Sequence, residues 1–259
     1  MDSKLKDKVY IVSGGSEGIG AAITRTLVEE GAKVLILTKA VEATHQMENT
    51  LNEKELRVVA EIGTLPDVAL CQKAVESALN NFGRLDGVVN NAGVNDSAGL
   101  EAGPEAFRLS VELNLFHFYD LVYCALPQLK QNRGSIINIA SKVALTGQGG
   151  TSGYAAAKGA ILGLTREWAV ELLPFAIRVN AILPAEVMTP LYRKWLKQFE
   201  HPEKMEMQIR SKIPLENRMT RPAEIAALVA FLLSDKSGHT TGQFLHPDGG
   251  YVHLDRKLT

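Results

Sequence analysis

The sequence predicts an α/β fold in which a doubly wound, seven-stranded parallel sheet carries helices on both faces. Two observations lead to this prediction. Short aliphatic runs alternate with amphipathic, helix-like stretches along all 259 residues, the pattern of a parallel sheet connected by helices. No linker, long repeat or low-complexity tract interrupts that alternation. Residues 1–259 are therefore expected to form a single domain, a normal size for one such sheet.

The composition narrows the class of protein. The formal net charge of -1 gives no reason to expect nucleic acid or an anionic membrane as a partner. Residues 1–8 are charged and lead directly into a strand-like run, so no secretory signal is visible. The longest apolar runs, such as 225–233, are too short to span a bilayer. Cys71 and Cys124 are isolated, which argues against a disulfide framework or a zinc site. A cytoplasmic location is the default expectation.

The first strand, turn and helix carry a glycine signature. Residues 8–15 form an apolar run that ends in glycine, and residues 21–31 have helical spacing. Gly14, Gly18 and Gly20 lie between them. Glycines there let the backbone turn sharply and approach a pyrophosphate at the helix N-terminus. The expectation is a Rossmann-type, dinucleotide-binding domain; a plain strand-to-helix turn is the alternative.

The end of the second strand, residues 33–38, bears on which dinucleotide fits. An acidic residue there hydrogen-bonds the ribose hydroxyls of NAD and repels the 2′-phosphate of NADP. This chain has Thr38 and Lys39 instead, which favours NADP. Glu17, inside the glycine loop, places a negative charge near the same phosphate and acts in the opposite direction. NADP is the predicted cofactor, with NAD as a possible substitute.

The alternation continues to a fourth strand that ends in small polar residues. Asn90, Asn91, Ala92 and Gly93 follow this strand, where ligands of open parallel sheets bind. Small residues there let a flat ring or a ribose lie close, although a simple turn explains the four residues equally well. The predicted elements of this part are a polar helix at 41–55, a strand at 57–62, a helix at 66–83 and the strand at 85–93.

A long helix is predicted over about 104–131, and a fifth strand over 135–141. The helix contains Asn114 and His117; an amide inside a helix is usually exposed or satisfied locally, so Asn114 taken alone indicates nothing. The strand delivers Ser141 at its carboxyl end.

Tyr154 and Lys158 lie four positions apart in an Ala-rich helix predicted to run to about residue 173. Residues four apart share one helix face. The unperturbed pKa of a phenol is about 10, and each unit of lowering takes roughly 1.4 kcal/mol. A cation about 4 Å away, at an effective dielectric constant of ~20, supplies roughly 4 kcal/mol. Lys158 is therefore expected to lower the pKa of Tyr154 enough for it to act as a base.

The last third of the chain contains a long insertion. A sixth strand is predicted at 176–184, a helix at 221–234 and a last short strand within 242–250. Residues 184–215 between them are helical in pattern, Met-rich and aromatic, which favours a substrate lid at about 186–213; an oligomer contact is the alternative. Three histidines fall seven apart on different predicted elements, so no metal site is expected; they are His239, His246 and His253.

These motifs together resemble those of the short-chain dehydrogenase/reductase family over the whole chain. The matching pieces are Ser13-Gly14-x-x-x-Gly18-Ile19-Gly20, Asn90-Asn91-Ala92-Gly93, Asn114, Ser141, Tyr154-x-x-x-Lys158 and Pro184-x-x-Val187-x-Thr189.

Two departures from the family pattern stand out. Ala185 and Glu186 replace the usual glycine and its neighbour, which reshapes the substrate side. Gly63 and Thr64 stand where an acidic residue contacts adenine, which loosens adenine binding.

The resemblance implies a catalytic set with defined roles. Tyr154, as phenolate, removes a proton from the substrate hydroxyl while a hydride passes to nicotinamide. Lys158 lowers the pKa of the tyrosine and binds the nicotinamide ribose. Ser141 holds the substrate oxygen, and Asn114 anchors a water on the proton path. The cofactor-binding residues expected from the resemblance and from the strand ends are Gly14, Ser16, Glu17, Gly18, Ile19, Thr38, Lys39, Asn91, Gly93, Tyr154, Lys158, Val187 and Thr189.

Within the family, longer segments resemble bacterial L-fucose dehydrogenases, which oxidise C1 of a free sugar. The segments are 90–100, 146–154, 184–195 and 248–256. The predicted substrate is therefore L-fucose or a related aldose, with a lactone as product. A site that reads sugar hydroxyls needs polar groups. The residues predicted to bind substrate are Asn95, Ser141, Gln148, Tyr154, Glu186 and Trp195.

Two alternatives remain open. One is a reductase of a ketone, 3-oxoacyl or steroid substrate on the same scaffold. The other is a dinucleotide-binding regulator without activity, against which the complete catalytic set argues. The resemblance further implies a homotetramer paired through the helices at 104–131 and 152–173.

Overall fold

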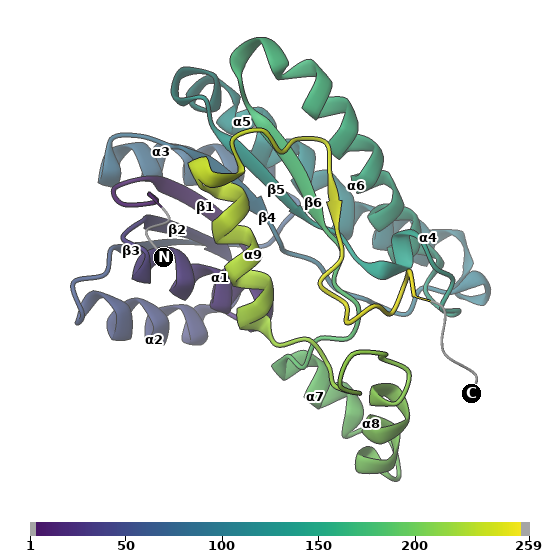
Figure 1. Cartoon of the computed structure of the whole chain (residues 1–259). Helices are drawn as coiled ribbons and strands as arrows, with labels where there is room; N and C mark the ends of the chain where they lie inside the picture. The colour runs from purple at the N-terminus through teal and green to yellow at the C-terminus, as the bar shows by residue number, and fades with distance from the viewer. Residues whose placement is uncertain (1–3, 255–259) are drawn as a thin grey trace.

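The computed structural model describes residues 4–254 and contains one seven-stranded sheet, shown in Figure 1. The strand order is β3-β2-β1-β4-β5-β6-β7, and every neighbouring pair is parallel. The predicted fold class is confirmed. The strands are β1 (Val9–Ser13), β2 (Lys33–Thr38), β3 (Val58–Ile62), β4 (Gly87–Asn90), β5 (Ser135–Ile139), β6 (Arg178–Ile182) and β7 (Phe244–Leu245).

Helices cover both faces of the sheet because the strands are apolar on both sides. In β1, Tyr10 and Val12 pack into one hydrophobic cluster while Val9 and Ile11 pack into the other, as the two-residue period of a strand requires. The helices on the first face are α1 (Gly18–Glu29), α2 (Val41–Asn52) and α9 (Pro222–Leu233). Those on the second face are α3 (Val68–Phe82), α5 (His117–Asn132) and α6 (Ser152–Glu171). Both core layers are thus closed by helices.

The predicted helix at 104–131 is not a continuous α-helix. It consists of α4 (Gly103–Val111), a π-helical turn at Glu112–Phe116 and then α5. The π turn contains Asn114. Turns of this kind occur mostly as single interruptions inside α-helices, frequently at functional sites.

The insertion forms two short helices that stand apart from the sheet layers. They are α7 (Pro190–Leu196) and α8 (Pro202–Arg210), which project from the body of the molecule below α9 in Figure 1. Leu191 and Met207 are largely exposed. Four single 3-10 turns complete the described structure, at Leu100–Ala102, Lys142–Ala144, Leu173–Phe175 and Asp235–Ser237.

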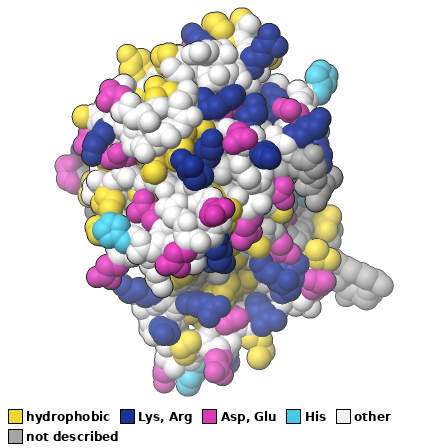
Figure 2. All heavy atoms as spheres, turned by 90° about the vertical axis from the view of Figure 1, so that its left-hand side faces the viewer, with side chains coloured by type: hydrophobic (Ala, Val, Ile, Leu, Met, Phe, Trp, Pro, Cys, Tyr) yellow, Lys and Arg dark blue, Asp and Glu magenta, His cyan; other side chains and the backbone are white. Residues whose placement is uncertain are grey.

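The distribution of charged side chains on the surface and the lengths of the apolar helices are two further features of the structure. On the face shown in Figure 2, basic and acidic side chains are interspersed. Within residues 4–254, no helix has both the length and the apolar character that crossing a membrane requires.

Candidate active site

The turn after β1 is bonded directly to the end of β4. The Ser13 hydroxyl accepts hydrogen bonds from the backbone N–H groups of Asn91, at 2.9 Å, and Ala92, at 3.0 Å. The Asn91 amide donates to the carbonyls of Ser13, at 3.0 Å, and Gly14, at 3.2 Å. β1 and β4 are neighbours at the point where the strand order reverses, which is where ligands of open α/β sheets bind.

The glycines of this turn are required by geometry. Gly14 and Gly18 have φ angles of +64° and +53°, which other residues rarely adopt. A Cβ on Gly20 would lie 2.0 Å from the Gly14 carbonyl oxygen. The backbone therefore stays bare where α1 begins, and the first N–H groups of a helix have no partner within it. This arrangement fits the pyrophosphate of a dinucleotide.

The end of β2 lies against the same turn. The hydroxyls of Ser16 and Thr38 lie 3.2 Å apart, and both side chains are buried. Thr38 also accepts a hydrogen bond from the Ala40 N–H at 3.2 Å. Glu17 and Lys39 are exposed at the surface of this region. The structure thus assembles the residues predicted to select between NADP and NAD.

The motif after β6 reaches the glycine turn from the other side. A Cβ on Gly18 would lie 3.3 Å from Thr189 Cγ2, so Thr189 packs on the glycine turn. Thr189 also begins α7, since its hydroxyl accepts a hydrogen bond from the Tyr192 N–H at 3.1 Å. Val187 is buried and forms an isolated parallel bridge with Thr220.

Tyr154 and Lys158 lie on one face of α6, as predicted. The Lys158 amine is 5.5 Å from the centre of the Tyr154 ring and donates a hydrogen bond of 2.8 Å to the Ile139 carbonyl, the last residue of β5. Ser141 follows that strand and caps the next turn, accepting from the Val143 N–H at 3.4 Å. The hydroxyl, the phenol and the amine therefore share one end of the sheet.

The protonation state of this pair differs from the sequence-based expectation. Burial raises the pKa of Tyr154 to about 12, and the nearby Ser141 hydroxyl only partly offsets this effect. Burial also lowers the pKa of Lys158 to about 7. In the protein itself, desolvation disfavours the charged form of both groups. The expectation that Lys158 alone brings the Tyr154 pKa toward neutrality is therefore wrong, because burial raises that pKa instead.

Asn114 is fully buried and connects two parts of the site. Its side-chain oxygen accepts from the Val94 N–H at 2.8 Å, and its amide donates to the Ser110 carbonyl at 2.9 Å. A Cβ on Gly93 would lie 3.0 Å from the Asn114 oxygen and 3.5 Å from the Lys158 amine. Both side chains therefore border the space that the missing side chain of Gly93 leaves open.

His117 also belongs to this region, although it was not predicted as a site residue. It is 1% exposed, and burial, together with the charge of Lys158, lowers its pKa to about 3. Its position three residues after Asn114, in an otherwise apolar stretch, is the signal that could have identified it. The neutral imidazole lies within electrostatic range of the buried amine of Lys158.

Of the two loop residues predicted to bind substrate, Asn95 is hydrogen-bonded within the protein and Gln148 is exposed. Asn95 is exposed but accepts from the Thr151 hydroxyl at 2.6 Å and from the Ser97 N–H at 3.2 Å. Gln148 is exposed in the loop before α6. Thr151 was not predicted as a site residue.

Glu186 lies in the segment that leads to the projecting helices, and Trp195 lies in the first of them, α7. Glu186 forms an ion pair with Lys142 and accepts a hydrogen bond of 2.7 Å from the Tyr192 hydroxyl. Trp195 is 41% exposed, and its ring contacts those of Tyr192, at 5.2 Å between centroids, and Phe199, at 4.8 Å. Lys142 was missed because its partner lies 44 residues away in the sequence. Tyr192 is only six residues from Glu186, but no motif marked it as a site residue.

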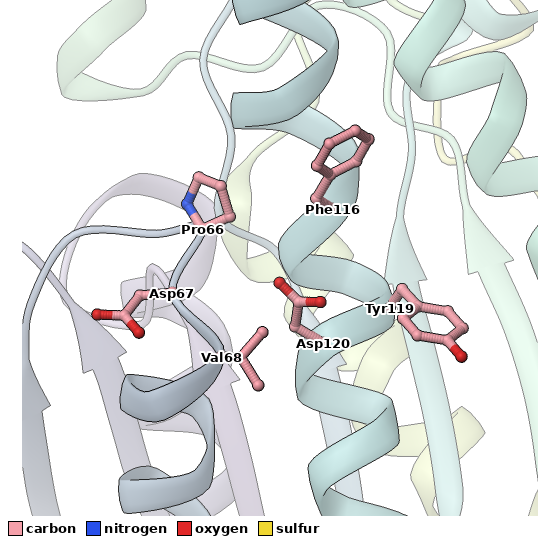
Figure 3. A pocket seen from close by; sticks show the side chains of 6 residues that line it. All are labelled: Pro66, Asp67, Val68, Phe116, Tyr119 and Asp120. Atoms are coloured by element: carbon pink, nitrogen blue, oxygen red, sulfur yellow. The ribbon is translucent and has the colours of Figure 1, made fainter.

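The predicted fourth segment, 248–256, is described only as far as Leu254, so its last two residues lie outside the described residues. Among residues 4–254, no group of three or more metal-ligating side chains is present. Figure 3 shows a hollow elsewhere on the molecule, where Phe116, Tyr119 and Asp120 project from one helix beside Val68.

Comparisons with known proteins agree with this geometry. A family model described as Enoyl-(Acyl carrier protein) reductase matches residues 14–252. An L-fucose dehydrogenase from Mus musculus is 36% identical over 259 residues, covering 99% of this chain and 93% of the relative. A 3-oxoacyl-[acyl-carrier-protein] reductase, FabG, from Thermotoga maritima is 33% identical, covering 96% and 99%. A solved structure described as Cj0485 dehydrogenase superposes with a TM-score of 0.93 at 42% identity, covering 100% of this chain and 99% of that chain.

Proposed function

The chain belongs to the short-chain dehydrogenase/reductase family, and we propose that this NAD(P)-dependent oxidoreductase oxidises C1 of a free aldose to a lactone. The proposed substrate is L-fucose or a stereochemically related sugar. The observation that carries the proposal is that Ser141, Tyr154 and Lys158 share one end of the sheet. Polar or charged side chains in the loops nearby, those of Asn95, Gln148 and Glu186, support a sugar as the substrate. The likeness to an L-fucose dehydrogenase supports the same substrate class.

The proposed catalytic roles are those that the family resemblance implies. Ser141 holds the C1 hydroxyl oxygen, and Tyr154 as phenolate accepts its proton. A protonated Lys158 amine would stabilise the ionised form of Tyr154 by charge attraction. Asn114 keeps the π turn against Val94 through its hydrogen bond to that residue and anchors a water on the path by which the proton leaves.

The dinucleotide supplies the hydride acceptor when it is bound. The glycine turn, with Ser16 and Ile19, holds the pyrophosphate side. Asn91 and Gly93 hold the adenosine ribose. Val187 and Thr189 hold the carboxamide, and Lys158 binds the nicotinamide ribose. These assignments are supported by the bare backbone at Gly14, Gly18 and Gly20 and by Thr189 packing against it.

NADP is the proposed cofactor, with NAD as the second choice. Thr38 contributes no negative charge at the end of β2, and exposed Lys39 adds a positive one. Glu17 lies on the same side and limits the preference for the 2′-phosphate. The proposal is therefore a preference for NADP rather than exclusive use.

A second candidate is reduction of a 3-oxoacyl or other keto substrate. It is favoured by the full-length likeness to FabG of Thermotoga maritima. The polar residues Asn95, Gln148 and Glu186 argue against it, because an acyl-chain or steroid site needs apolar walls.

The experiment that separates the candidates is a steady-state assay at 340 nm with both dinucleotides. L-fucose, L-galactose and D-arabinose are tested for formation of NADPH or NADH, and a 3-oxoacyl thioester and a cyclic diketone for consumption. Turnover of one of the sugars supports the proposal. Rapid NADPH oxidation by a keto substrate, with no sugar turned over, would overturn it.

The Tyr154→Phe variant tests the third possibility, a regulator without catalytic activity. An enzyme loses turnover by several orders of magnitude in this variant while it still binds the dinucleotide. If Tyr154→Phe changes nothing measurable in the assay, catalysis by this tyrosine is excluded.

A further inference from the structure

A buried ion pair joins the two sides of the candidate active site. Lys142 directly follows Ser141, and Glu186 comes three residues before Thr189. The Lys142 amine pairs with the Glu186 carboxylate although the residues are 44 positions apart in the chain. The two side chains are only 8% and 14% exposed. The pair therefore links the Ser141 turn to the segment that packs on the glycine turn.

Each partner is held by further contacts. The Lys142 N–H donates to the Pro184 carbonyl at 2.9 Å, and its amine lies 4.2 Å from the centre of the Tyr251 ring. The Glu186 carbonyl accepts from the Thr220 N–H at 3.0 Å. The loops that follow β5 and β6 are thus connected by backbone and side-chain bonds together.

The network extends to the projecting helices through Tyr192. Its hydroxyl donates to the Glu186 oxygen that does not face Lys142. Burial and the neighbouring Glu186 raise the pKa of Tyr192, so its hydroxyl keeps its proton and remains a donor. Because Tyr192 belongs to α7 and contacts Trp195, the position of α7 depends on the same carboxylate.

Both carboxylate oxygens of Glu186 thus have protein partners. Breaking a buried pair by removing one partner leaves an uncompensated charge, whereas neutralising both partners avoids that cost. Each single change is therefore expected to leave one buried charge without its partner, whereas the double change leaves none. A double-mutant cycle measures this difference.

We propose that Lys142 and Glu186 are positioning residues, which fix the Ser141 turn relative to residues 187–189 and hold α7 over the site. Ser141 holds the reacting oxygen and residues 187–189 hold the ring that accepts the hydride. The ion pair then sets the separation of donor and acceptor. This inference rests on the proposed function for the assignment of those two roles. The alternative is that Glu186 binds substrate hydroxyls directly.

The test compares Lys142→Met, Glu186→Gln and the double variant with the unaltered enzyme. Binding of NADPH is measured by its fluorescence in the absence of any substrate. Turnover is measured with the aldose that the unaltered enzyme oxidises, with hydrogen or deuterium at C1. The matched control is Arg84→Met, which removes a 2.7 Å cation partner from buried Asp86 at the start of β4, the opposite end of the sheet.

We expect each single variant to lose about 10- to 100-fold in kcat, because small misplacements of reacting groups have costs of that size. The C1 deuterium isotope effect is expected to increase, since hydride transfer becomes the slower step. NADPH binding is expected to weaken about 3- to 10-fold in each single variant and to recover in the double variant, as coupled neighbours do. Arg84→Met is expected to lower the melting temperature without changing the isotope effect.

Two results would overturn the proposal. One is a rise in KM for sugar alone in Glu186→Gln, with kcat, isotope effect and NADPH binding unchanged, which assigns Glu186 to direct substrate contact. The other is a double variant whose losses in kcat and NADPH binding equal the sum of the losses in the two single variants, in free-energy terms, which means that the residues act independently. If no aldose is oxidised by the unaltered enzyme, the proposed function fails, while the NADPH titrations still decide whether the two residues act as one unit.

Discussion

The buried amine of Lys158 makes the stability of the protein depend on pH. Its pKa is lowered to about 7 in the folded protein, because burial disfavours the ammonium form. The unfolded chain then binds more protons than the folded protein above pH 7, up to the ordinary lysine pKa. Stability rises with pH wherever the unfolded state binds more protons, so this group stabilises the fold as the pH increases.

We predict that the free energy of unfolding rises by about 1–2 kcal/mol between pH 7 and 8.5 through Lys158, with a slope of at most about 1.4 kcal/mol per unit. The two cysteines, whose pKa values are raised in the folded protein, act in the opposite direction from the upper end of this window, where the thiols of the unfolded chain begin to lose their protons. Urea unfolding of the protein and of Lys158→Met at several pH values measures the difference. Equal slopes for both proteins would contradict the assignment.

Gly93 is the residue at which a single methyl group tests the packing of the site. Its Cβ would come within 3.0 Å of the Asn114 oxygen and 3.5 Å of the Lys158 amine. Gly93→Ala is expected to displace one of these side chains and to lower kcat/KM at least about 10-fold, in line with the cost of small misplacements. Gly159→Ala in α6, where the added Cβ meets nothing within 4 Å, is the control and is expected to keep full activity.

At the scale of the element, we propose that the end of β2 sets the dinucleotide preference. Thr38 is fixed there by Ser16 and by the Ala40 N–H, so a carboxylate at this position points into the same region. Thr38→Asp is expected to shift the ratio of kcat/KM values toward NAD by about 10-fold or more, since the carboxylate repels the 2′-phosphate and bonds the ribose hydroxyls. The ratio measured with both dinucleotides checks this. An unchanged ratio would place the adenosine ribose elsewhere.

Most elements were predictable from the sequence because each strand is a short apolar run and each helix is amphipathic. The gathering of Ser141, Tyr154 and Lys158 was predictable as well, since strand ends of a parallel sheet share one edge. The π turn around Asn114 was not, because it is a backbone irregularity that no pattern of residue types specifies. Pairing of Lys142 with Glu186 depends on tertiary structure, and so does the burial that moves the pKa values of Tyr154 and Lys158.

At the scale of the whole molecule, the strand order explains why distant segments form one site. Strands β2 and β3 lie on one side of β1, and the chain then crosses back so that β4 lies on the other side of β1. The glycine turn, the Asn91 turn, the Ser141 turn and the Val187 segment thereby follow strands β1, β4, β5 and β6, which are neighbours in the sheet. One sheet edge therefore carries the residues proposed to bind the dinucleotide and those proposed to act in catalysis.

Four exposed apolar side chains on the outer side of the helical run from α4 to α5 point to a contact with a second copy of the chain. Leu109, Phe116, Tyr119 and Tyr123 are each at least 50% exposed. Tyr119 and Tyr123 stack, with ring centroids 6.2 Å apart, and Figure 3 shows Phe116 and Tyr119 projecting from the same helix. Exposed apolar patches of this kind mark association sites, which supports the homotetramer proposed from the family resemblance.

We predict that Tyr119→Glu reduces the assembly to dimers or monomers, because it places a charge at the centre of this apolar face, where charged residues are depleted in interfaces. Val41→Glu, which adds the same charge to an exposed apolar position on α2, is the control and is expected to leave the mass unchanged. Analytical ultracentrifugation of both variants gives the masses. A tetramer that persists in Tyr119→Glu, or a monomeric unaltered protein, would show that this face is not the contact. If the variant does dissociate, its activity shows whether the site is complete in one chain.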